Sequence, residues 1–214
     1  MKRKVMLLMA LAIVFTGVYA QGVKFGVKGG LNISSLGDYE HVIAHEDAEL
    51  DEKLGLYAGA FAQFYFSKNF GLETGLFYTQ LGGRDKENDW NEQFKVTANP
   101  AYLQLPVSAF YRFNLTPKLA FYPSFGLYAG YGLSGKFKVK GTVGSVDVGT
   151  ENDYFDNFAR KFDAGITVGV NFQYSKFLLG VGYDQGFLRV NKDKSEYGDN
   201  AYNSNLRVTV GVVF

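Results

Sequence analysis

Two histidines are the residues whose type and spacing are best suited to chemistry. His41 and His45 lie four residues apart in a stretch rich in carboxylates. If this stretch formed a helical turn, both imidazoles would share one face and could bind a transition metal together with a carboxylate. The pattern differs from the His-Glu-x-x-His motif, and a solvated acidic loop explains it more simply. We therefore predict no metal site and no cofactor, and His41 and His45 stay as the only metal-ligand candidates.

The elements that would position functional groups are strands, and the C-terminus shows this most clearly. Every second residue counted back from the end is apolar, and the residues between are mostly small or polar. Period two over nine residues is typical of a strand with one apolar and one polar face. A strand that ends on an aromatic residue resembles the terminal strand of bacterial outer-membrane barrels. This resemblance implies a signal read by the barrel-insertion machinery, formed by Phe214, Val212, Val210, Val208 and Leu206.

Similar patterns predict eight strands joined alternately by short turns and long polar loops. Most are long enough for a tilted membrane strand, and the alternation matches the short periplasmic turns and long external loops of outer-membrane barrels. A soluble eight-stranded barrel, the alternative, would not show this rhythm. The predicted fold is an all-β, eight-stranded, antiparallel up-and-down transmembrane β-barrel. Its predicted strands are 23–33, 54–66, 69–81, 101–113, 119–134, 162–174, 177–188 and 205–214, and its predicted long loops are 34–53, 82–100, 135–161 and 189–204.

Strand parity assigns seven charged residues to the barrel interior. The interior of an eight-stranded barrel is only wide enough for side chains to fill. Four basic and three acidic residues in so narrow a space predict a paired polar network, because an unpaired buried charge is costly. The alternative is the selectivity lining of a small pore. The seven residues are Lys24, Lys28, Glu73, Arg112, Asp163, Asp184 and Arg207.

Aromatic residues gather beside the predicted short turns, on the apolar faces of the strands. This placement predicts a ring of aromatics at one membrane interface, which includes Phe25 and Phe214 if the first and last strands close the barrel. A second ring is predicted at the opposite end from Tyr78, Tyr131, Phe162 and Tyr183. Further aromatic residues point inward by parity as core filler. Pro106 lies inside a predicted strand, where we expect a local bulge because proline lacks an amide donor.

The N-terminus predicts secretion. Three basic residues, Lys2, Arg3 and Lys4, precede an apolar run that is too short to span the membrane comfortably as an anchor. We expect residues 1–20 to be a cleaved signal peptide and residues 21–214 to be the barrel domain. The absence of cysteine excludes disulfides and lipid attachment through cysteine. Cleavage would leave two more acidic than basic residues, a balance that argues against nucleic acid as a partner.

Four short segments resemble the PorT-like, porin-family group of small outer-membrane β-barrels. Most members of this group have no assigned activity, so the resemblance implies a location and a fold rather than a reaction. The segments are Phe25-Gly26-Val27-Lys28-Gly29-Gly30-Leu31-Asn32, Tyr102-Leu103-Gln104-Leu105-Pro106-Val107, Phe162-Asp163-Ala164-Gly165 and Arg207 to Phe214.

These features predict a non-enzymatic, monomeric protein of the bacterial outer membrane with a structural or binding role. Its expected partners are membrane lipid, the insertion machinery and an extracellular protein or glycan that contacts the loops, where Trp90, Tyr154 and Phe155 could equally cap the barrel mouth. A narrow passive channel is the second alternative. An enzyme at the barrel rim is the third, but no Gly-x-Ser-x-Gly elbow occurs and His41 and His45 lie well inside a loop, so no catalytic residue is predicted.

Overall fold

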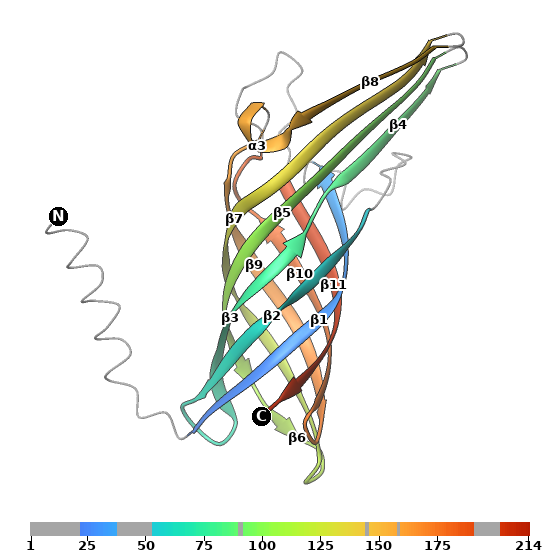
Figure 1. Cartoon of the computed structure of the whole chain (residues 1–214). Helices are drawn as coiled ribbons and strands as arrows, with labels where there is room; N and C mark the ends of the chain where they lie inside the picture. The colour runs from blue at the N-terminus through green and yellow to red at the C-terminus, as the bar shows by residue number, and fades with distance from the viewer. Residues whose placement is uncertain (1–21, 38–52, 90–91, 144–145, 158, 191–201) are drawn as a thin grey trace, which may run out of the picture.

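Eight antiparallel strands pair with their neighbours in chain order and close on themselves (Figure 1). The structure is a computed structural model that describes residues 22–37, 53–89, 92–143, 146–157, 159–190 and 202–214. The last barrel strand pairs with the first, from Gly26 opposite Val213 to Gly37 opposite Tyr202. The predicted eight-stranded barrel is therefore confirmed. Its wall consists of β1 (Gly22–Gly37), β2 (Lys53–Tyr65), β3 (Phe70–Gln80), β5 (Glu92–Tyr111), β7 (Leu119–Val143), β9 (Phe162–Tyr174), β10 (Phe177–Gly186) and β11 (Tyr202–Val213).

Two of these strands continue beyond the barrel rim and form a projecting sheet with two further strands (Figure 1). β4 (Gly83–Asp89) pairs with the start of β5, and β8 (Val146–Asp153) pairs with the end of β7. The prediction of a loop over 82–100 is wrong, because this range contains β4. Its almost wholly polar sequence does not indicate a strand, since the strand forms by pairing with β5. The predicted loop 135–161 likewise contains a hairpin, formed by the end of β7 and β8. We call this four-stranded sheet the extension.

Several strand ends also differ from the predictions. β1 continues to Gly37 and β11 begins at Tyr202, so both strands are longer at the extension end than the sequence indicates. The short β6 (Phe113–Asn114) and the helical turn α3 (Tyr154–Asn157) complete the described elements. The predicted signal peptide at residues 1–20, His41, His45 and Trp90 lie outside the described residues.

Pro106 does not cause the bulge that the sequence predicts. β5 pairs with β7 in unbroken register through Pro106, and the register shift falls instead between Ala101 and Tyr102. On the other side, the paired positions with β3 skip the proline, and the Thr74 hydroxyl donates to the Pro106 carbonyl over 2.8 Å. The missing amide donor therefore interrupts only the pairing of β5 with β3, and the strand needs no extra residue at Pro106.

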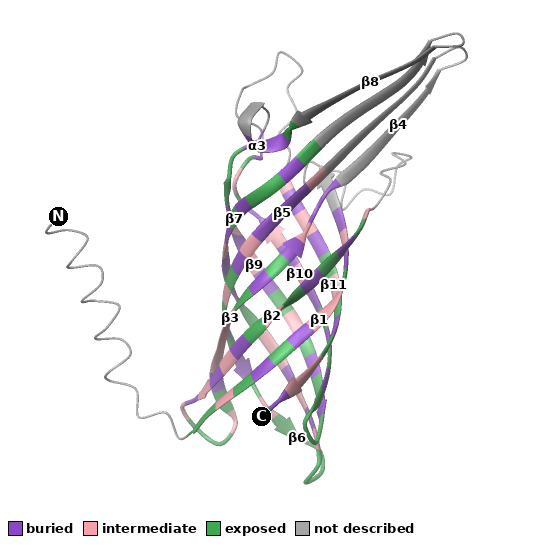
Figure 2. Ribbon diagram, in the orientation of Figure 1, coloured by how far each residue is buried: buried purple, intermediate pink, exposed green. Residues whose placement is uncertain are grey.

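The outer face of the barrel is apolar, and exposed and buried residues alternate along the strands (Figure 2). In β11 and at the terminal residue, Leu206, Val208, Val210 and Phe214 are exposed, whereas Thr209 is buried. So many exposed apolar side chains would be unfavourable in water. The outer face that they form is the one expected to contact lipid. In the described part of the chain, none of the helices has the length and apolar character needed to cross a membrane.

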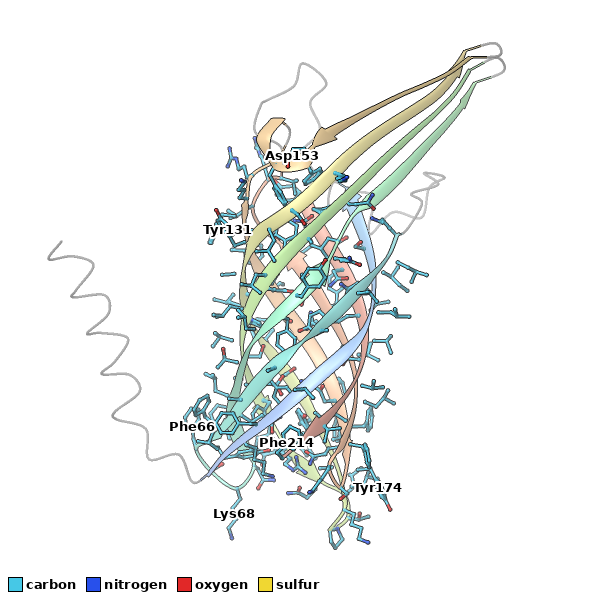
Figure 3. All side chains as sticks on the ribbon, in the orientation of Figure 1. Phe66, Lys68, Tyr131, Asp153, Tyr174 and Phe214 are labelled. Carbon is cyan, nitrogen blue, oxygen red and sulfur yellow. The ribbon has the colours of Figure 1, made fainter. Side chains whose placement is uncertain are left out.

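Aromatic side chains encircle the short-turn end of the barrel. Phe66, Tyr174 and Phe214 all lie at this end, and Tyr131 lies toward the other (Figure 3). Ring contacts link residues from three successive strands, with centroid distances of 4.8 Å from Tyr111 to Phe113, 5.0 Å from Phe113 to Phe121 and 5.9 Å from Phe121 to Phe172. Such a ring of aromatic side chains is the arrangement expected at a membrane interface.

A charge placed on the apolar outer face should destabilise the barrel in lipid. Val181 is 50% exposed and pairs with Val170 on one side and Val208 on the other, away from both ends of β10. Val181→Lys should lower the free energy of unfolding by about 2–4 kcal/mol in vesicles, measured by urea titration with heat-modifiable gel migration as the readout. Val181→Ala is the size control and should cost much less. Equal losses for both variants would mean that this face does not contact hydrocarbon.

Candidate functional site: the barrel lumen

Aromatic side chains fill much of the barrel lumen, from the short-turn end to mid-height. Tyr57 stacks on Phe77 with a centroid distance of 4.7 Å, and Tyr65 meets Phe110 edge to face at 5.2 Å. Glycines on the wall leave room for these rings: a Cβ at Gly26 would lie 2.4 Å from the Phe61 ring. The buried cluster therefore occupies the space that a pore would need. It comprises Tyr57, Phe61, Tyr65, Phe77, Phe110, Tyr122, Leu178 and Val213.

An ion pair between β1 and β3 crosses this aromatic layer. The Lys28 ammonium donates to Glu73 Oε1 over 2.5 Å and lies 4.4 Å from the centre of the Phe61 ring. The second carboxylate oxygen of Glu73 accepts from Gln63 Nε2 over 2.8 Å, and the Tyr65 hydroxyl donates to Gln63 Oε1 over 3.0 Å. Both charges are thus compensated, as burial in a confined space requires.

A second ion pair lies between β10 and β11, nearer the extension. The Arg207 guanidinium pairs with Asp184 Oδ2 and also donates to the Thr167 hydroxyl over 2.8 Å. Its guanidinium carbon lies 5.3 Å from the centre of the Tyr57 ring. Gly182 makes room for this side chain, since a Cβ there would lie 2.9 Å from an Arg207 nitrogen. The Arg207–Asp184 pair therefore links β10 and β11 to the aromatic cluster.

Asp163 is buried but has no basic partner among the described residues. Its Oδ2 accepts from the Tyr128 hydroxyl over 3.1 Å and from Asn203 Nδ2 over 2.9 Å. This carboxylate is held by neutral donors only, unlike Glu73 and Asp184. It lies toward the extension end, at the start of β9.

Lys24 and Arg112 lie at the opposite end, where a recess of about 370 Å³ opens beside the short turns. Arg112 donates to Gln173 Oε1 over 2.5 Å and to Asn114 Oδ1 over 3.0 Å. The Lys24 ammonium lies 5.1 Å from the centre of the Tyr65 ring. No carboxylate lines this recess, but Arg112 hydrogen-bonds to Tyr65, which is linked through Gln63 to Glu73.

The extension end of the lumen is closed by α3. Tyr154 and Phe155 are 4% and 2% exposed, and Phe155 meets Tyr102 edge to face at 5.4 Å. Gly132, which directly precedes the register shift in β7, leaves room for this ring, because a Cβ there would lie 2.3 Å from the Phe155 ring. Burial raises the pKa of the Tyr154 phenol, which favours its uncharged form. The sequence left open whether Tyr154 and Phe155 contact a partner or cap the barrel mouth. In the described structure, they pack over the barrel mouth as a cap.

Little free space remains between the cap and the aromatic cluster. A cavity of about 40 Å³ lies at mid-height, with Lys28, Glu73 and Arg207 in its lining, and a second of about 10 Å³ lies nearer the cap. The smaller volume is about that of a single water molecule. The larger cavity is mainly polar and the smaller one mainly apolar, and neither has room for an organic substrate.

The seven charged residues are buried or half-buried in the structure, and most of their hydrogen-bond partners were not among the predicted residues. Gln63 and Gln104 face inward by the same parity and could have been found in the sequence. Asn203 falls in the predicted loop 189–204, and its role depends on the longer β11 of the structure. Within the described residues, no group of three or more His, Cys, Asp or Glu side chains could hold a metal ion.

Removing one partner of the Lys28–Glu73 pair should cost more than removing both. Lys28→Met leaves a buried carboxylate without its cation and should lower the free energy of unfolding by about 3–5 kcal/mol. The double variant Lys28→Met/Glu73→Gln should recover most of this loss. Urea unfolding in vesicles gives the coupling energy of the cycle, and Lys118→Met, in an exposed turn, is the control. Strictly additive losses would mean that the two charges do not interact.

Comparison with known proteins gives a family match and distant structural likenesses. Neisserial surface protein A is similar, at 16% identity and a TM-score of 0.43 over 91% of this chain and 100% of that one. OprG of Pseudomonas aeruginosa is similar at 13% identity and a TM-score of 0.45, over 89% and 95%. Ail of Yersinia pestis, solved with the heparin analogue sucrose octasulfate, is similar at 12% identity and a TM-score of 0.42, over 91% and 100%.

The family match rests on the sequence. A search of curated proteins finds no match to this chain. The model of the outer membrane protein beta-barrel domain matches residues 19–192, which is more than half of the chain and includes most of the barrel wall. The protein therefore belongs to the outer membrane protein beta-barrel domain family.

Proposed function

We propose that this protein is a non-conducting, non-enzymatic barrel with a binding role at the bacterial cell surface. The observation that carries the proposal is the filled lumen. Buried rings of Tyr57, Phe110 and Tyr122 occupy it up to mid-height, and Tyr154 and Phe155 pack at its extension end. An ion that crossed this interior would have to displace packed aromatic side chains and two ion pairs. Close packing makes such displacement costly, which disfavours the narrow channel.

The extension supports a binding role. Its register aligns three lysine positions across neighbouring strands, since Lys86 pairs with Lys95 and Lys95 pairs with Lys140. Directly paired positions share one face of a sheet, and like charges there are unfavourable. The next position in this row, on β8, is Gly149, so the row contains no acidic residue. A row of three lysine positions would suit an anionic partner, and we propose a sulfated or phosphorylated glycan.

The remaining sequence predictions are part of the same proposal. Residues 1–20 would direct secretion and be cleaved, and the terminal residues Leu206 to Phe214 would be read by the insertion machinery. The protein would act as a monomer, and the four segments quoted above support placement in the PorT-like group. The protein would carry out no reaction at the barrel rim.

Conductance tests the filled lumen directly. The refolded protein should give no stable single-channel steps in planar bilayers. The double variant Phe110→Gly/Tyr122→Gly, which removes two rings of the aromatic cluster, should give measurable steps and shows that the assay can detect an opened barrel. Stable steps from the wild-type protein at the same protein density would contradict the proposal and favour the channel.

Charge reversal in the extension tests the binding role. Lys86→Glu/Lys95→Glu/Lys140→Glu should weaken binding to immobilised heparin at least tenfold, and wild-type binding should fall as salt is added. The control variant Lys68→Glu/Lys118→Glu/Lys176→Glu changes the net charge equally but in the three short turns, and it should bind as the wild type does. Absence of wild-type binding, or equal loss in both variants, would refute an anionic glycan as the partner of the extension.

A further inference from the structure

The recess at the short-turn end of the barrel is lined by basic and neutral side chains only. It measures about 370 Å³ and opens beside the short turns. Its three basic residues come from separate places in the chain: Lys24 from β1, Lys68 from the turn after β2, and Arg112 from the position after β5. Figure 3 shows Lys68 at the outermost point of this end, beyond Phe66 and Phe214.

Acidic side chains do not balance the positive charge at this end of the barrel. The whole sequence has 22 basic and 21 acidic residues, but the described segments between the Lys28–Glu73 pair and the short turns contain basic residues only. The α-carboxylate of Phe214 lies at this end but does not line the recess. A concave, positively charged surface attracts small anions. The basic residues are Lys24, Lys68, Arg112, Lys118 and Lys176, within residues 22–27, 61–72, 109–124, 170–179 and 211–214.

Neutral groups hold Arg112 in position and leave its charge uncompensated. Its guanidinium donates to Gln173 Oε1 over 2.5 Å and to Asn114 Oδ1 over 3.0 Å, and it also bonds to Tyr65. The nearest carboxylate in this series of hydrogen bonds is Glu73, which is already part of an ion pair. A guanidinium has five N–H donors, which is more than these three contacts require. The recess therefore contains a fixed cation with donors to spare.

Lys24 adds a second inward cation to the recess. Its ammonium contacts the Tyr65 ring, 5.1 Å from the ring centre, and the charge of Arg112 repels it. Among the described residues, no carboxylate forms an ion pair with Lys24. Asn114 supplies a neutral donor, because its oxygen must face the guanidinium, which can only donate, and its amide nitrogen is then directed elsewhere. An anion that entered the recess would separate the two cations and accept from all three groups.

We propose that this recess binds the phosphate group of a small soluble phosphomonoester. Such a group carries a charge of about −1.5 to −2 at pH 7 and three strong acceptor oxygens, which suit a guanidinium and two ammonium groups. A sulfate ester or a carboxylate carries one charge and balances less of the field. The ligand is soluble rather than a lipid, because Val23 and Phe25 on the same strand are exposed on the outer face, whereas Lys24 lies between them on the inner face. The site is at the opposite end from the extension and is independent of whether the extension binds a glycan.

The test compares two ligands of the same shape that differ in charge. Methyl phosphate and methyl sulfate are titrated at pH 7 into the refolded protein in phosphatidylcholine nanodiscs, with saturation transfer to the methyl protons as the readout and empty nanodiscs as the blank. Methyl phosphate should bind saturably, and methyl sulfate should bind at least about fivefold more weakly because it has one charge fewer. Addition of phosphatidate to the nanodiscs should leave methyl phosphate binding unchanged, since a lipid phosphate does not reach the recess.

Three variants assign the binding to the recess. Lys24→Gln should weaken methyl phosphate binding at least about fivefold. Gly22→Leu keeps every charge and should block the recess, because Gly22 lines it and a Cβ there would meet no atom within 4 Å. Lys118→Gln removes the same charge as Lys24→Gln from an exposed turn outside the lining and should bind as the wild type does.

Heat-modifiable migration verifies that each variant is folded. The absence of saturable wild-type binding, equal binding of the two ligands, or equal losses in Lys24→Gln and Lys118→Gln would overturn the proposal. Unchanged binding by folded Gly22→Leu would overturn it as well. Displacement of methyl phosphate by phosphatidate would assign the recess to a lipid and contradict a soluble ligand.

Discussion

Inside hydrocarbon, a backbone amide or carbonyl without a partner finds no water to replace it, so a spanning sheet must have no free edge. Pairing of β1 with β11 meets this requirement, because it joins the first and last strands of the wall over twelve paired positions. The closure also determines which residues face inward. On each strand, period two then sends one set of side chains to lipid and the other to the lumen.

The narrowness of the resulting lumen explains its contents. Eight strands enclose only enough space for side chains, so charged residues there must be matched with partners at short range. Lys28 with Glu73 and Arg207 with Asp184 meet this need as ion pairs. Aromatic rings fill the remaining volume, and glycines at Gly26 and Gly132 give Phe61 and Phe155 the room to do so. The interior is thus a packed core that contains ion pairs.

Much of this arrangement was predictable because successive side chains on each barrel strand alternate between lipid and lumen. β9 has the predicted bounds, and parity correctly assigns the lipid-facing and inward residues of β5 and β11. Parity could not reveal β4, whose polar residues become a strand through pairing with β5 rather than through their own pattern. It also missed Asn203, because a strand that continues beyond the membrane loses the apolar alternation that marks it. The cap depends on the contact of Phe155 with Gly132, which lies over twenty residues away and has no local signature.

The central claim is that the folded lumen is closed to solutes, and thiol labelling tests it most directly. The chain has no cysteine, so Ser108→Cys introduces a single thiol beside the mid-height cavity, and Ser67→Cys introduces one in an exposed turn. A small charged thiol reagent should label Ser67→Cys rapidly and leave folded Ser108→Cys unlabelled until denaturant is added. Labelling of folded Ser108→Cys at a rate near that of Ser67→Cys would contradict a filled lumen.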